Sequence, residues 1–148
     1  SDRDFRSTLL MTIVGRESLF WLKVGDGAML YQSREGTRHL IGEMEKGEFA
    51  NQTVFVDSQL PWESVQFGMK PCSDMTGLAL MSDGAAERLV AHDSSQTAGV
   101  FDTWFKALQA KQLGAESLYQ FFNEAQVWEG STHDDKSLAL AARGVSST

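Results

Sequence analysis

The feature that most constrains this fold is a succession of short apolar segments separated by glycine-containing turns. Residues Ser7–Val14 and Ser18–Val24 are rich in apolar and β-branched side chains, which favours buried β-strands. Residues 15–17 form a hairpin-sized connection, and residues 25–27 turn the chain into a third strand over Ala28–Gln32. We therefore predict that the chain starts with an antiparallel meander.

Strand-like segments separated by Asp, Pro and Gly continue to about the middle of the chain, so we expect the sheet to continue through them. These further predicted strands are Thr37–Leu40, Thr53–Val56, Val65–Met69 and Leu78–Met81. A short helix over Ala85–Val90 should follow the last of them.

The later part of the chain has helical periodicity instead. Two sets of apolar residues recur at helical spacing on either side of Gly114, and such a stripe more often packs on a sheet than binds a cofactor. The two sets are Phe101, Trp104, Phe105, Leu108 and Leu118, Phe121, Phe122, Ala125. A final strand over Ser137–Ala142 completes an α+β protein, with a largely antiparallel β-sheet that carries helices on one face.

Charge and composition exclude several classes of function. A net charge of −7 and no run of basic residues argue against nucleic acid as a partner. Any phosphate-bearing substrate would need a local positive centre, which a divalent cation can supply. A lone cysteine, Cys72, fits a reducing, cytoplasmic setting. Apolar stretches such as Leu9–Val14 are far shorter than the roughly 20 residues that span a bilayer, so we expect no membrane association.

Three aspartates share one context, because each lies where a predicted strand ends or is about to begin. Asp26 stands in VGDG, Asp83 in MSDG and Asp134 in HDDKS. Each alone is typical of a turn or a helix N-cap. Together, at neighbouring strand ends, carboxylates make a hard oxygen site that suits Mg²⁺ or Mn²⁺. The three histidines show no ligand spacing.

The order of these motifs resembles that of the type 2C metal-dependent Ser/Thr protein phosphatases, the PPM family. STLLM is followed by LFWLKVGDGAML, then GLALMSDGAAERL, and finally HDDKSLAL. The resemblance covers nearly the whole chain and is closest to compact bacterial members, in which GEFANQT at residues 47–53 also has a counterpart. It implies part of the four-layer α-β-β-α sandwich of that family.

The resemblance also implies roles for particular residues. Asp83 takes the place of the metal ligand in the family's SDG segment, and Asp134 that of the closing aspartate on the same metal. Both would act in catalysis through the metal. Asp26 matches the aspartate that helps to hold an additional, weaker metal. Glu87 and Asp135 are candidate outer ligands, although Asp135 replaces the family's usual asparagine.

The implied activity is hydrolysis of phosphoserine and phosphothreonine by a water that two Mn²⁺ or Mg²⁺ ions activate. The implied partners are a phosphorylated protein substrate and a cognate Ser/Thr kinase system. Cys72 is better interpreted as a small buried or half-buried residue than as a nucleophile, because no phosphate-cradling Cys-x5-Arg loop accompanies it.

Two elements of the family are absent from these 148 residues: the acidic residue after an arginine, and the Asp-Gly-His-Gly segment that bridges both metals. We therefore expect residues 1–148 to be a single partial phosphatase domain without its N-terminal metal-binding segment. Two remaining ligands cannot hold a pair of near-octahedral ions, so the fragment alone should be nearly inactive. Unpaired edges and an uncovered apolar face should favour self-association.

The sequence leaves two alternatives open. The first is a non-catalytic pseudophosphatase or partner-binding scaffold of the same fold, which carboxylates far apart or salt-bridged would favour. The second is an unrelated α+β binding domain whose motifs match by chance, in which the strand order would differ.

Overall fold

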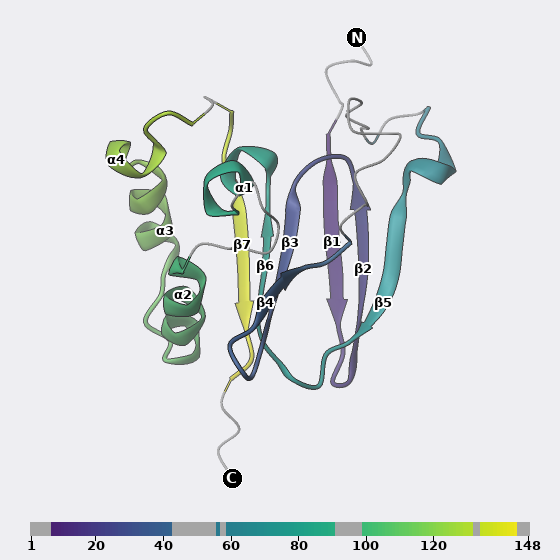
Figure 1. The fold of residues 1–148 in the computed structure, drawn as a ribbon, viewed down its shortest axis with the longest axis horizontal. Helices are drawn as coiled ribbons and strands as arrows, with labels where there is room; N and C mark the ends of the chain where they lie inside the picture. The colour runs from purple at the N-terminus through teal and green to yellow at the C-terminus, as the bar shows by residue number, and fades with distance from the viewer. Residues whose placement is uncertain (1–6, 43–55, 57–58, 91–98, 132–133, 145–148) are drawn as a thin grey trace.

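The computed structural model describes residues 7–42, 56, 59–90, 99–131 and 134–144. These residues form three layers: a three-stranded sheet, a four-stranded sheet packed against it, and helices on the other face of the four-stranded sheet (Figure 1). This arrangement confirms the predicted α+β class, with antiparallel strands and helices on one face.

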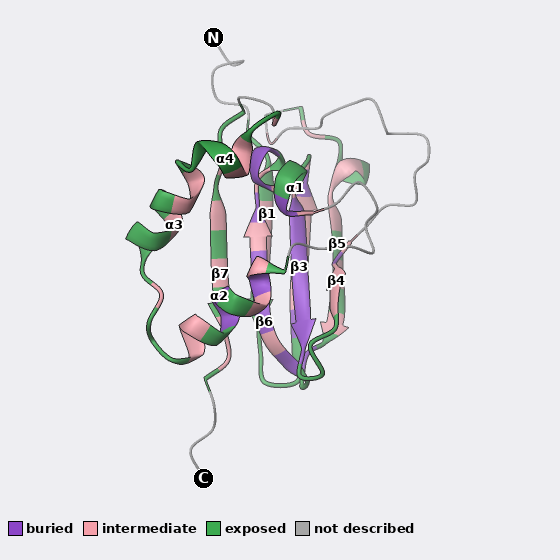
Figure 2. Ribbon diagram, turned by 60° about the vertical axis from the view of Figure 1, so that its left-hand side comes forward, coloured by how far each residue is buried: buried purple, intermediate pink, exposed green. Residues whose placement is uncertain are grey.

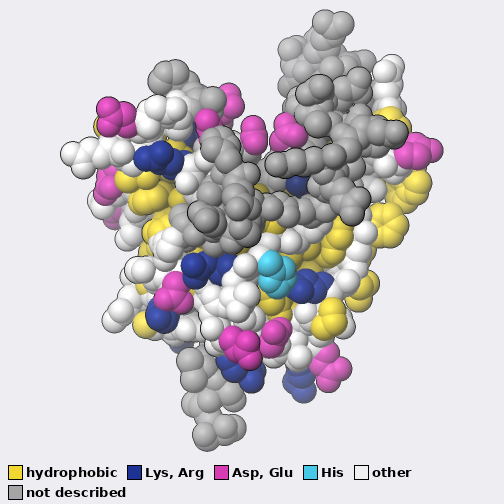
Figure 3. Space-filling view, in the orientation of Figure 1, with side chains coloured by type: hydrophobic (Ala, Val, Ile, Leu, Met, Phe, Trp, Pro, Cys, Tyr) yellow, Lys and Arg dark blue, Asp and Glu magenta, His cyan; other side chains and the backbone are white. Residues whose placement is uncertain are grey.

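The three-stranded sheet contains β1 (Leu9–Val14), β2 (Ser18–Val24) and β5 (Gln66–Pro71), in the order β1-β2-β5. Both pairs are antiparallel. A short 3-10 helix, η2 (Trp62–Ser64), precedes β5. Exposed apolar side chains lie on the sheet's outer face, and in Figure 3 hydrophobic side chains follow the flank where β5 lies. Those that are more than two-fifths exposed in β1 and β5 include Leu9, Ile13, Phe67 and Met69.

The four-stranded sheet contains β3 (Ala28–Ser33), β4 (Arg38–Leu40), β6 (Met75–Met81) and β7 (Leu138–Ala142). Its order is β4-β3-β6-β7, and all of its pairs are antiparallel. β3 is buried along its whole length, because one sheet covers one of its faces and helices cover the other (Figure 2).

The predicted meander is therefore wrong at its second turn, and the single continuing sheet is two sheets. β2 pairs with β1 and β5, whereas β3 pairs with β4 and β6. The turn at residues 25–27 crosses from one sheet to the other. The composition of a short glycine-containing turn does not distinguish such a crossing from a hairpin. The crossing lets β3 bury both of its faces.

Two apolar cores hold the layers together. Between the sheets, Leu19 of β2 packs with Met29 and Tyr31 of β3 and Leu78 of β6, and all four are at most 2 % exposed. The second core lies between the four-stranded sheet and the helices, and both contribute side chains to it. Its buried members include Leu30, Ala79, Phe101, Trp104 and Phe105.

The helices are α1 (Asp83–Leu89), α2 (Val100–Gln109), α3 (Ala115–Phe122) and α4 (Ala125–Trp128). The aromatic stripe of α2 faces the sheet as predicted. The second predicted helix is broken, because α3 ends at Phe122 and Ala125 begins α4. The indole of Trp128 donates a 3.0 Å hydrogen bond to the Phe121 carbonyl and so fixes this break. None of the described helices is long and apolar enough to cross a membrane.

Other predicted boundaries differ by a few residues. The predicted strand at 78–81 starts earlier, at Met75, and the one at 65–69 runs from Gln66 to Pro71. The predicted strand Thr53–Val56 lies outside the described residues except for Val56, which forms a single antiparallel bridge with Ser7.

Gly77 offers a test of the packing between α2 and the four-stranded sheet. A Cβ at this position would overlap the ring of Phe105, which is buried. We expect Gly77→Ala to lower the free energy of unfolding by about 2 kcal/mol, because the ring must move within a close-packed core. Urea unfolding measures the change. Gly144→Ala is the matched control, because a Cβ there would have nothing within 4 Å. Equal effects of the two changes would contradict this view of the packing.

Candidate functional site

Strand register brings the three candidate aspartates to one end of the four-stranded sheet. Ala28 of β3 pairs with Met81 of β6, and Met81 pairs with Leu138 of β7. Asp26 lies just before β3, Asp83 is the first residue of α1 directly after β6, and Asp134 lies shortly before β7. In Figure 3, several Asp and Glu side chains lie at the upper end of the molecule, where β2 and β6 finish in Figure 1, and others lie at the lower end beside Lys and Arg.

Ser82 fastens the segment that carries Asp134 to the start of α1. Its hydroxyl donates to the carbonyl of Asp135 at 3.2 Å and accepts from the backbone N–H of Ser137 at 2.9 Å. The Ser82 N–H donates in turn to the Ser137 carbonyl at 3.0 Å. The three bonds fix the position of residues 134–137 relative to Asp83.

Glycines at two positions permit close approach of the backbone segments around the aspartates. A Cβ on Gly84 would lie 2.5 Å from the Asp135 carbonyl oxygen, so only glycine fits beside this segment. Gly27 has φ +115, and a Cβ there would lie 2.8 Å from the Met81 carbonyl oxygen. These glycines in VGDG and MSDG therefore bring the three segments together.

The carboxylates influence one another electrostatically. Partial burial raises the pKa of Asp83, and the negative charges of Asp26, Asp134 and Glu87 raise it further. Lys23 near the end of β2 acts in the opposite direction. Glu87 is four residues after Asp83 on α1, so the two side chains share a helix face. The cluster is thus a concentration of negative charge that a cation would relieve.

The donor chemistry suits a hard divalent cation, but the described side chains do not form a complete ligand set. Within the ranges that the structure describes, no group of three or more His, Cys, Asp and Glu side chains is placed so that it could hold a metal ion. Asp26, Asp83 and Asp134 share one end of the sheet without forming such a group. Asp135 contributes through its backbone, since its carbonyl accepts the Ser82 hydrogen bond. Its predicted outer-ligand role, like that of Glu87, stays a prediction.

Three residues that shape this site were not predicted from the sequence: Ser82, Gly84 and Lys23. Ser82 directly precedes α1, where serine is a typical N-cap, yet its hydroxyl bonds to the 134–137 segment instead of capping the helix. Glycine is unfavourable in a helix, so Gly84 directly after Asp83 could have indicated a close approach of another backbone segment. Lys23 had no signal beyond its place three residues before Asp26.

Cys72 is fully buried, which confirms its interpretation as a buried residue. Its Sγ lies 3.5 Å from the Gly15 carbonyl oxygen and 3.4 Å from Nη2 of Arg143. It therefore belongs to the packing at the opposite end of β6 from Asp83.

Comparison with known proteins identifies the family. A family model described as protein phosphatase 2C matches residues 1–123. The chain belongs to the protein phosphatase 2C family, as its motifs predicted. A comparison with curated proteins gives no significant match.

Solved structures with the same fold are longer than this chain. The chain resembles a bacterial serine phosphatase with 15 % identity and a TM-score of 0.59, and the match covers 96 % of this chain and 60 % of that structure. A variant of a bacterial serine phosphatase with one arginine replaced by alanine matches with 16 % identity and a TM-score of 0.56, over 91 % and 52 % of the two chains. The chain thus spans between half and two thirds of the length of these structures.

The raised pKa of Asp83 predicts a stability effect with a definite pH dependence. The folded state holds the carboxyl proton more tightly than the unfolded state, so wild-type stability falls as pH rises through the titration of this group. Asp83→Asn should therefore raise the metal-free Tm at neutral pH, by only about 1–3 °C, because the side chain is only partly buried and solvent screens the repulsion.

The difference should vanish at acidic pH, where the carboxyl is protonated in both states. Scanning calorimetry in EDTA at neutral and acidic pH measures it. Glu35→Gln is the control, since Glu35 lies just beyond the other end of β3. A neutral-pH Tm unchanged or lowered by Asp83→Asn would contradict the electrostatic argument.

Proposed function

We propose that this chain forms the C-terminal part of a metal-dependent protein phosphatase that hydrolyses phosphoserine and phosphothreonine monoesters. The observation that carries the proposal is the placement of Asp26, Asp83 and Asp134 at one end of the four-stranded sheet. Membership of the protein phosphatase 2C family supports the same function.

Asp83 and Asp134 would hold Mn²⁺ or Mg²⁺, with Asp26 on an additional ion and Glu87 and Asp135 outside the ligand shell. Bound divalent ions supply an activated water and offset the charge on the phosphoryl group. The remaining ligands would come from a part of the domain outside this chain, in agreement with the incomplete ligand set and with the greater length of the similar structures. This chain alone should therefore be nearly inactive.

The chain's own residues would position these ligands. The Ser82 hydroxyl holds the segment that contains Asp134, and Gly84 lets that segment approach α1. The positive charge of Lys23 lowers the pKa of Asp83, so Lys23 would limit the repulsion among the carboxylates. The net charge of −7 repels phosphate esters at long range, which makes a local positive centre necessary for substrate binding.

The proposed substrate is a phosphorylated protein, and the proposed setting is a bacterial cytoplasm with a cognate Ser/Thr kinase system. The single cysteine, buried and free, supports a reducing compartment.

A non-catalytic scaffold of the same fold is the second candidate. The lack of a metal-holding group among the described side chains favours it. It differs from the first candidate in one measurable respect, because a scaffold needs no contribution of Asp83 to cation binding.

Cation binding and turnover test the proposed function together. Mn²⁺ should raise the Tm of the wild-type chain slightly, and Asp83→Asn should abolish this rise while Glu35→Gln retains it. With p-nitrophenyl phosphate, the chain alone should show little turnover in Mn²⁺ and none in EDTA. The longer polypeptide that includes the missing ligands should show Mn²⁺-dependent turnover that Asp83→Asn lowers by at least about 100-fold, since a metal ligand is lost.

A longer polypeptide whose turnover survives Asp83→Asn would refute the assigned role of Asp83. A longer polypeptide without any turnover, together with no Mn²⁺ effect on Tm, would favour the scaffold.

A further inference from the structure

Lys23 lies on the face of β2 that points toward the four-stranded sheet. Leu19 and Trp21 share this face, because side chains alternate along a strand, and both pack in the core between the sheets. A Cβ on Gly42, which follows β4 of the other sheet, would touch the Trp21 ring and so marks the direction of this face. Half-buried Lys23 continues the row, one residue before the end of the strand.

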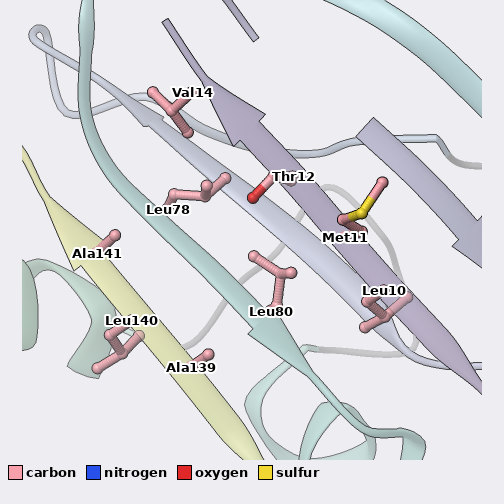
Figure 4. A pocket seen from close by; sticks show the side chains of 9 residues that line it. All are labelled: Leu10, Met11, Thr12, Val14, Leu78, Leu80, Ala139, Leu140 and Ala141. Atoms are coloured by element: carbon pink, nitrogen blue, oxygen red, sulfur yellow. The ribbon is translucent and has the colours of Figure 1, made fainter. Parts of the chain in front are cut away.

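The partner of Lys23 in β1 supports the same orientation. Leu10 stands directly opposite Lys23 in the register. Leu10 lines the space between the sheets together with Leu78 and Leu80 of β6 (Figure 4). Residues opposite each other in a sheet point to the same side, so the Lys23 side chain also faces this space. It does so at the end where the chain crosses to the other sheet through Asp26.

Of two lysines near this end of the four-stranded sheet, Lys23 is the one that faces the carboxylates. Its positive charge acts on Asp83. The other, Lys136, is held at a different place. Its Nζ donates to the Asp134 carbonyl at 3.1 Å and lies 5.0 Å from the centroid of the Trp128 ring. The geometry therefore gives the two lysines different roles.

The charge balance of the site indicates that Lys23 serves an anion. Asp83 and the groups that act on it comprise four carboxylates and one ammonium group. The proposed function places two divalent ions among them, whose charge equals that of the four carboxylates. The charge of Lys23 then remains to attract a phosphate ester. Without it, these groups would have no net positive charge in a chain whose overall charge of −7 repels anions.

We propose that Lys23 binds the phosphoryl group of the substrate, with charge-assisted hydrogen bonds from Nζ to phosphoryl oxygens. A lysine suits this role because its flexible four-carbon stem ends in a compact cation with three donors. The ligand is the dianion of a phosphate monoester, and inorganic phosphate, the product, has the same chemistry. The inference rests on the proposed function and adds a substrate-binding residue to it.

Calorimetric titration of the longer polypeptide with inorganic phosphate in Mg²⁺ tests the contact directly. We expect Lys23→Met to weaken phosphate binding about tenfold or more, because the charged donor is lost while the apolar stem is kept. Lys23→Arg should recover most of this loss, since it retains the charge and the donors. Lys70→Met is the matched control and should bind phosphate as the wild type does. Lys70 pairs with Leu19 on the same face, at the other end of β2.

Steady-state kinetics with p-nitrophenyl phosphate separate a contact with the substrate from an effect on the metal ions. In folded Lys23→Met, checked by circular dichroism, KM should rise about tenfold while kcat changes little, because the contact exists in ground and transition states alike. The Mn²⁺ concentration for half-maximal activity should stay unchanged. A lower Mn²⁺ requirement with unchanged phosphate affinity would limit Lys23 to a role beside the carboxylates and overturn the proposal.

Asp83→Asn separates this inference from the proposed function. Suppose that the wild type shows Mn²⁺-dependent turnover that Asp83→Asn lowers, but that Lys23→Met binds phosphate normally. The proposed function then stands and the role of Lys23 is overturned. Phosphate binding that depends on Lys23 in a polypeptide without turnover would reject catalysis and keep the anion site. No phosphate binding by the wild type would overturn the role of Lys23.

Discussion

The arrangement of the candidate site depends on the antiparallel register of β3, β6 and β7. Ala28, Met81 and Leu138 stand side by side across this sheet, so the segments that carry Asp26, Asp83 and Asp134 leave it at the same end. A shift of one residue in either pairing would exchange the side chains that a strand presents to its two faces and would disrupt the packing of the two cores, which makes the register costly to change. The packing of the core therefore determines the geometry of the site.

Local contacts then fix the positions of these segments more closely. Ser82 holds the 134–137 segment through its hydroxyl and its backbone, and Gly84 lets that segment lie against α1. Partial burial raises the pKa of Asp83, and repulsion from the neighbouring carboxylates raises it further. This concentration of charge opposes stability in the absence of a cation, as is common where function and folding make different demands on one residue.

Some predictions followed from local patterns, and others failed for a common reason. The strand at 18–24 and the aromatic face of α2 were predictable because alternation and helical spacing depend on near neighbours. The turn at residues 25–27 was predicted as a hairpin, whereas it links two sheets. The break between α3 and α4 was missed because the Trp128 bond to the Phe121 carbonyl has no signature in the residue spacing.

By itself, the sequence determined which segments are strands and helices, which residues are acidic at strand ends, and which family the motifs resemble, since all of these are local in the chain. Only the tertiary structure decided that the strands divide into two sheets, that Ser82 joins α1 to the segment before β7, and that Ala139 and Ala141 of β7 are exposed. These features arise from contacts between segments far apart in the chain, whose free energy depends on mutual burial and hydrogen bonding and not on composition.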